Sequence, residues 1–164
     1  MYQVGDLVVY PSQGVCRVID HREMEIAGVV KQYYVLNPFN DQKLEISLPV
    51  NGKKQLLHDL ATAQEAEAVF KQFENPASPW IDKAPQRNQA FAEIMRRGDR
   101  DEIGQLLNTL YRKRIELESI DKKFNATDAR FVENVQSNLF FEMATSLDTT
   151  TDDIYERVMK IILN

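Results

Sequence analysis

The period of the hydrophobic pattern changes once along this chain, close to Leu57, and this change divides the sequence into two parts. The first part consists of short runs rich in β-branched and aromatic residues, separated by turn-forming residues. The runs are Leu7–Tyr10, Val15–Ile19, Gln32–Leu36 and Leu44–Leu48, with turns at residues 11–14, 27–28, 37–38 and 49–52. This pattern predicts a small antiparallel SH3- or Tudor-like β-barrel over residues 1–58, because closing the sheet removes exposed strand edges.

After Leu57 the apolar residues recur with the period of an α-helix. Thr62 and Glu65 have the spacing of a capping box, for a helix that ends near Asn75. We expect this helix and a proline-rich bend to connect the two domains over residues 59–78. Four amphipathic helices with short connections predict a compact bundle over residues 79–164. They are expected from Pro85 to Gly98, around Ile103–Tyr111, after Asn125 or Thr127, and from Thr150 or Thr151. The predicted fold class is therefore α+β, a small β-barrel followed by an all-α domain.

The composition argues against several classes of function. No apolar run is longer than four residues, whereas a membrane span needs roughly 20, and the N-terminus does not resemble a secretory signal. We therefore expect a soluble, cytoplasmic protein with no membrane partner. Cys16 is the single cysteine and lies between apolar neighbours, a setting typical of an inert buried thiol. Since phosphate-binding and metal-binding motifs are also missing, we expect no enzymatic activity, no metal, no cofactor and no small-molecule substrate.

The distribution of charge is more informative than the net charge of −5. Residues 83–114 carry 8 basic and 4 acidic side chains, between two acidic flanks. Arg96 and Arg97 lie in the last turn before Gly98, where cations complement the helix dipole without any partner. Arg112 and Lys113 lie inside the third predicted helix, where a basic pair indicates either a solvated face or contact with nucleic acid.

Trp80 is the only tryptophan, and it lies on the proline-rich bend close to Lys83 and Arg87. An aromatic ring held beside cations on a stiff loop can stack on an unpaired base or wedge into a base step. The alternative is that Trp80 simply packs against the second predicted helix. The sequence pattern by itself leaves both interpretations open.

The N-terminal residues 4–15, Val-Gly-Asp-Leu-Val-Val-Tyr-Pro-Ser-Gln-Gly-Val, closely resemble the opening motif of the CarD family of bacterial transcription regulators. The resemblance continues at residues 33–36 and 46–50. In the second half it includes Pro79-Trp80, Arg87, Gly98-Asp99, residues 106–114 and 128–131, and a closing helix. The likeness therefore spans nearly the whole chain.

This resemblance implies a transcription regulator with two partners. The barrel would dock on the β subunit of RNA polymerase by laying a strand edge against it. The helical domain would contact promoter DNA, without sequence specificity, at the upstream edge of the melted bubble and stabilise the open complex. There Trp80 would act as a minor-groove wedge, and basic residues would hold phosphates. The expected DNA contacts are Trp80, Lys83, Arg87, Arg96, Arg97, Arg112 and Lys113.

The predicted polymerase contacts differ from those of some relatives. Those relatives present arginines where this chain has Met24 and Ser47. We therefore expect Met24, Glu25, Ile26 and Ser47 to contact the polymerase through main-chain or apolar interactions. The alternative function is a protein adapter on the polymerase, whose helical domain binds another protein rather than DNA. In either case a monomer is expected.

Overall fold

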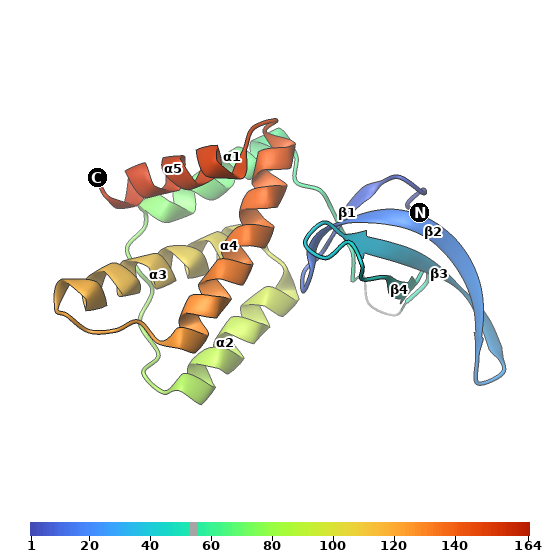
Figure 1. Cartoon of the computed structure of the whole chain (residues 1–164), viewed down its shortest axis with the longest axis horizontal. Coiled ribbons are helices and arrows are strands. Elements are labelled where there is room, and N and C mark those ends of the chain that lie inside the picture. Colours follow the sequence, from blue (N-terminus) through green and yellow to red (C-terminus); the bar gives the residue numbers. More distant parts are fainter. Residues whose placement is uncertain (53–55) are drawn as a thin grey trace. The chain divides into compact units, whose positions relative to one another are not determined.

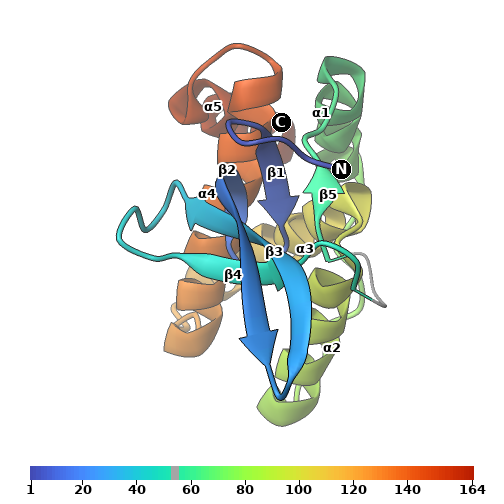
Figure 2. The ribbon, with the colours of Figure 1, turned by 90° about the vertical axis from the view of Figure 1, so that its right-hand side faces the viewer.

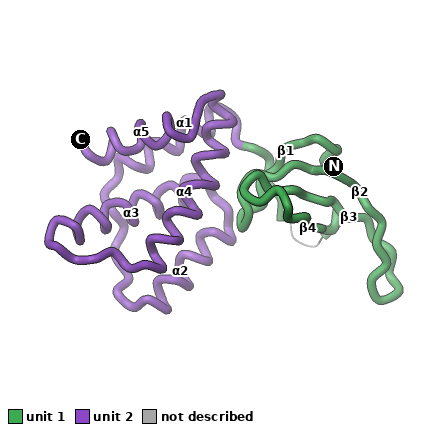
Figure 3. Tube along the Cα trace, viewed as in Figure 1, with its two compact units in different colours: residues 1–60 green, residues 61–164 purple. Residues whose placement is uncertain are grey.

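The chain divides into two compact units, residues 1–60 and 61–164, in a computed structural model that describes residues 1–52 and 56–164 (Figure 3). Each unit has its own hydrophobic core. The division falls after Leu60, so most of the segment predicted as a connector lies in unit 2. Ala66, Val69 and Phe73 of that segment are fully buried in the unit 2 core, which explains why the segment packs there.

Unit 1 contains an antiparallel sheet whose five strands follow the order β4-β3-β2-β1-β5 (Figure 2). The strands are β1 (Leu7–Tyr10), β2 (Gly14–Ile26), β3 (Val29–Pro38), β4 (Ile46–Pro49) and β5 (His58–Asp59). Within the described residues β4 and β5 do not pair with each other, so the sheet is open. The antiparallel strands expected from the sequence are confirmed, but the closed barrel is not, because β4 and β5 are the two outer strands of the described sheet.

One face of this sheet carries the core of unit 1. Val8, Val18 and Leu36 are fully buried there together with Cys16. Burial raises the pKa of the Cys16 thiol to about 11. The expectation of a buried thiol is therefore confirmed.

Strands β2 and β3 continue beyond their neighbours as a two-stranded hairpin (Figure 1). β1 pairs only with residues 14–17 of β2, and β4 pairs only with residues 33–36 of β3. The hairpin turn lies at Ala27 (φ 53°) and Gly28 (φ 77°), and both residues have the left-handed conformation that a two-residue hairpin turn requires. The turn was predicted at these residues, but the length of β2 was not, because residues 20–25 are almost all polar.

Unit 2 consists of helices that pack around one core (Figure 1). They are α1 (Ala63–Val69), the 3₁₀ helix η1 (Phe70–Glu74), α2 (Ala84–Arg97), α3 (Arg100–Ser119), α4 (Ala126–Ser146) and α5 (Thr151–Ile162). The predicted boundaries are confirmed by their caps. Thr62 and Glu65 form the capping box, Gly98 ends α2 at φ 70°, and Asn125 and Thr150 cap α4 and α5. None of the described helices could cross a membrane.

Candidate functional site

The first candidate site is the β2–β3 hairpin, which carries Met24, Glu25 and Ile26. On the β1 side, no described strand pairs with β2 between Asp20 and Ile26. The outward N–H and C=O groups of this stretch therefore have no sheet partner there. A free strand edge can accept a strand from a binding partner through main-chain hydrogen bonds.

The four predicted polymerase contacts divide between the two faces of the sheet. Ser47 pairs with Val35, and Val35 pairs with Asp20, so these side chains share one face. Because side chains alternate along a strand, Met24 lies on that same face and Glu25 lies on the opposite one. The sheet thus brings Met24 and Ser47 to one surface, but not Glu25.

Aliphatic side chains at the tip of the hairpin are exposed. Ile26 is 57% exposed, Val29 is 52% exposed and Val30 is 60% exposed. Exposed apolar residues beside an open strand edge are typical of a docking surface. Val29 and Val30 were not singled out from the sequence, although their place after the Ala27-Gly28 turn was a usable signal.

The second candidate site surrounds Trp80, on the bend between η1 and α2. The indole is half-buried and meets the Phe91 ring of α2 edge-on, with centroids 6.4 Å apart and an interplanar angle of 62°. The Arg87 guanidinium carbon lies 4.8 Å from the centre of the Trp80 ring, and Lys113 Nζ lies 5.5 Å from it. Trp80 therefore packs against α2, as the purely structural interpretation predicted. It is also partly exposed and has basic neighbours, as the DNA-contact interpretation predicted.

Polar side chains of α3 hold the bend before Trp80. The Ser78 N–H donates to Thr109 Oγ1 at 3.0 Å. Gln105 Nε2 donates to the Pro76 carbonyl at 3.0 Å, and Asn108 Nδ2 donates to the Asn75 carbonyl at 2.9 Å. These bonds explain why polar residues occupy this side of α3.

Arg87 does not extend into solvent as the predicted phosphate contact would. Its side chain is buried, with Nη2 2.8 Å from Asp128 Oδ2 and Nε 3.2 Å from Asp128 Oδ1. Nη1 donates to the carbonyls of Ile81 and Asp82 at 3.0 and 3.1 Å. A guanidinium with these partners has little capacity left for a phosphate, so we remove Arg87 from the candidate DNA contacts.

Arg96 and Arg97 are exposed at the far end of α2, about 14 Å along the helix from Arg87. Arg96 Nη2 lies 2.6 Å from Glu93 Oε2, and its hydrogen bond lowers the pKa of the Glu93 carboxyl. Arg97 makes two bonds of 2.9 Å to the Glu102 carboxylate, and these raise the pKa of the Arg97 guanidinium. The structure does not bring these arginines together with Trp80, and their charges are matched by neighbouring carboxylates.

Arg112 and Lys113 are neighbours in sequence with different surroundings. Arg112 donates to the Phe73 carbonyl and to Asn108 Oδ1, both at 2.8 Å, and so joins η1 to α3. Lys113 lies beside Trp80, 3.5 Å from Glu116 Oε1, and its side chain is 20% exposed. Of the two residues, Lys113 is the better placed for a ligand that reaches the indole.

Six basic side chains of unit 2 are exposed and form no ion pair with a described residue: Lys71, Lys83, Lys122, Lys123, Arg130 and Lys160. Lys122 and Lys123 lie on the α3–α4 loop, and Lys122 N–H donates to the Leu117 carbonyl at 2.9 Å. In the same loop, Phe124 packs against the core with Arg114 5.1 Å from its ring centre. Arg114, the residue after Lys113 on α3, thus contacts this loop. Sequence reasoning missed Lys122 and Lys123, which lie outside the basic segment 83–114.

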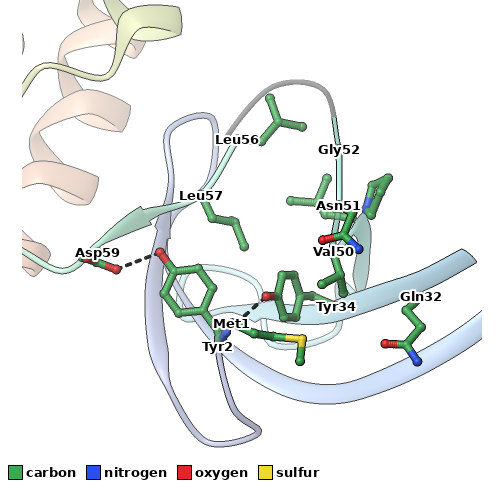
Figure 4. A pocket seen from close by; sticks show the side chains of 12 residues that line it. Met1, Tyr2, Gln32, Tyr34, Val50, Asn51, Gly52, Leu56, Leu57 and Asp59 are labelled. Carbon is green, nitrogen blue, oxygen red and sulfur yellow. Dashed lines mark hydrogen bonds between the residues drawn. The ribbon is translucent and has the colours of Figure 1, made fainter.

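A cavity of about 780 Å³ opens in unit 1 beside the N-terminus (Figure 4). The Tyr2 hydroxyl donates to Asp59 Oδ1 at 2.8 Å, and the Tyr2 N–H donates to the Tyr34 hydroxyl at 3.1 Å. The polar groups of both tyrosines are thus engaged within the unit, and we assign no ligand to this cavity.

Residues 2–60 match the family model of the CarD-like/TRCF RID domain. This type of domain interacts with the β subunit of RNA polymerase, and the match covers unit 1 almost completely. The class of protein is therefore one that interacts with RNA polymerase in transcription. Through residues 2–60 the chain is similar to CarD-like proteins, and this similarity supports an interaction with RNA polymerase.

Proposed function

We propose that the protein docks on the RNA polymerase β subunit through unit 1 and stabilises the promoter open complex through contacts that Trp80 and nearby cations make at the upstream fork of the bubble. The match to the CarD-like/TRCF RID domain supports the first step. The open edge of β2 and the exposed tip of the hairpin offer the surface for it.

The setting of Trp80 is the observation that carries the second step. A half-buried indole that rests on Phe91 is held firmly and still presents part of its ring to a ligand. Aromatic rings of this kind can stack on or wedge between bases, and every base offers a π-face. Such a contact depends on whether the two DNA strands are separated and not on their base sequence.

The candidate phosphate contacts are Lys83 and Lys113 from the predicted set, together with Lys122 and Lys123 of the α3–α4 loop. Phosphate contacts supply affinity without sequence information. Since the net charge is −5, the affinity of the free protein for DNA should be low. Tethering to the polymerase would raise the effective concentration of unit 2 at the promoter.

Regulation requires that the protein bind the open complex better than the closed one. A ligand shifts an equilibrium only through its different affinity for the two states. An indole that inserts at a separated base step gains contacts that an intact duplex does not offer. Trp80 therefore supplies the difference in affinity, and the lysines add binding that is similar in both states.

The test is the lifetime of open complexes at a promoter where they dissociate readily. Trp80→Ala should leave polymerase binding intact and shorten the open-complex lifetime by about tenfold, the effect of losing about 1–3 kcal/mol of stacking. Tyr155→Ala is the matched control, because Tyr155 is a 42% exposed aromatic residue on α5, and it should change nothing. An unchanged lifetime with Trp80→Ala would reject the wedge.

The second candidate function is a protein adapter. It is favoured by the pairing of Arg96 with Glu93 and of Arg97 with Glu102, which leaves fewer free cations than the sequence suggested. Crosslinking from residue 80 within a polymerase–promoter complex distinguishes the two functions. Crosslinks to DNA support the wedge, whereas crosslinks only to protein support the adapter.

A further inference from the structure

The ion pair between Arg87 and Asp128 has the geometry of a two-pronged clamp. Two parallel N–H groups of the guanidinium face the two oxygens of the carboxylate, at 2.8 and 3.2 Å. The side chains are only 6% and 2% exposed, so both charges are removed from water. The pair connects the first turn of α2 to the first turn of α4.

Neither burial nor helix electrostatics explains why an arginine occupies this position. A buried ion pair often contributes no more stability than well-packed apolar residues of similar size. Arg87 also lies in the first turn of α2, where the helix dipole disfavours a cation. Asp128 occupies the corresponding turn of α4, where the dipole favours an anion. The reason for an arginine at position 87 must therefore lie in the other contacts that its side chain makes.

Those contacts lead to Trp80. Nη1 of Arg87 binds the carbonyls of Ile81 and Asp82, the two residues that directly follow Trp80. The guanidinium also lies 4.8 Å from the centre of the indole ring. On the other side of Trp80, the Ser78 N–H is bonded to Thr109 of α3. Trp80 thus lies between two anchored points of a segment that is neither helix nor strand.

We infer that Arg87 and Asp128 are positioning residues that hold the Trp80 bend in one conformation, with the indole fixed at the surface of unit 2. This inference rests on the proposed function, because it assigns the pair to the presentation of the wedge. Lysine cannot reproduce the four hydrogen bonds of Arg87, because an ammonium group has three N–H donors and lacks the planar fork that binds both oxygens of the carboxylate.

The experiment measures NMR order parameters of the free, full-length protein. The test variant is the double substitution Arg87→Met and Asp128→Leu, which removes both buried charges together and so avoids leaving one unpaired. Thermal unfolding should be preserved. The backbone amides of residues 80–82 should change from the rigid range, about 0.85, to below about 0.6, the range of a flexible segment.

The matched control is the double substitution Arg97→Gln and Glu102→Gln. It removes an arginine–carboxylate pair with two bonds of 2.9 Å that begins on the same helix but touches no residue of the bend. Residues 80–82 should stay rigid in this control. If they also stay rigid in the folded Arg87→Met, Asp128→Leu protein, the clamp is rejected.

Arg87→Lys provides a second measurement that keeps the charge beside Asp128. We expect a smaller loss of order at residues 80–82, and an unchanged order parameter would contradict the inference. Because no DNA is present, these results do not depend on the wedge. A variant with a mobile bend and an unchanged open-complex lifetime would support the clamp and refute the proposed function.

Discussion

At the scale of single residues, the basic side chains of unit 2 are of two kinds. Some are bonded to partners within the protein, and others are exposed. Arg87 and Arg112 are engaged by partners 41 and 39 residues away in sequence, Asp128 and the Phe73 carbonyl. Lys122 and Lys123 are exposed without an ion pair among the described residues. A local basic run could therefore indicate a charged segment, but it could not separate structural arginines from cations available to a ligand.

This difference predicts which cations bind DNA. Replacing Lys122 and Lys123 by alanine should weaken binding equally for all sequences and reduce the slope of log K against log salt by about 2. Replacing Arg96 and Arg97 should change the slope less, because carboxylates already match these charges. DNA titrations at several salt concentrations measure both slopes. A larger effect from the arginine pair would contradict the assignment.

A second residue-scale prediction concerns Cys16. Because burial raises its pKa from 9 to about 11, the thiolate fraction at pH 8 should be about 100-fold lower than in the unfolded chain. A thiol reagent that absorbs on reaction should therefore modify the native protein slowly and the urea-unfolded protein at once. The native rate should rise as the pH approaches 11. Rapid modification of the native protein at pH 8 would contradict this prediction.

At the scale of elements, helix boundaries were predictable because their signals are local. The Thr62–Glu65 capping box and the left-handed Gly98 each depend on residues within one helical turn. The length of β2 was not predictable in the same way, since Asp20 to Glu25 carry few apolar side chains. Their strand conformation depends on pairing with β3, from His21 opposite Tyr34 to Ile26 opposite Val29.

The hairpin turn gives a prediction at this scale. Ala27 has φ 53°, a conformation that costs alanine about 1–2 kcal/mol, whereas asparagine adopts it more readily. Ala27→Asn should therefore stabilise the hairpin by about 0.5–1 kcal/mol. Amide hydrogen exchange of residues 22–25 and 30–33 measures this locally, as slower exchange.

The neighbouring glycine supplies the matched control. A Cβ atom at Gly28 would meet no atom within 4 Å, so Gly28→Ala tests backbone conformation alone. Its φ of 77° predicts a loss of about 1 kcal/mol and faster exchange of the same amides. Equal exchange in the two variants would show that the turn does not limit hairpin stability.

At the scale of the whole molecule, the α+β order of the two units followed from the change of hydrophobic period. Unit 1 ends at Leu60, close to the end of the domain predicted over residues 1–58, whereas most of the segment predicted as a connector, residues 59–78, lies in unit 2. Val69 and Phe73 reveal their place in unit 2 only through long-range packing in its core. The open sheet was missed for a similar reason, since closure depends on the pairing of strands distant in sequence.

Two isoleucines allow polymerase docking to be assigned to unit 1. Ile26 is 57% exposed on the hairpin and Ile120 is 55% exposed on unit 2, so they differ mainly in location. Ile26→Asp should weaken binding to the polymerase β subunit at least tenfold, because burying this side chain contributes about 1.5–3 kcal/mol. Ile120→Asp should leave the affinity unchanged. Equal affinities of both variants in a pull-down titration would place the docking surface elsewhere.

The free edge of β2 also bears on how the protein behaves at high concentration. An antiparallel pairing of two such edges centred on Met24 would set Glu23 of each molecule opposite Glu25 of the other, on the same face of the joined sheet. Like charges directly opposite each other oppose that pairing. The glutamates would thus discourage self-association in this register, while a strand with basic side chains would meet no such repulsion.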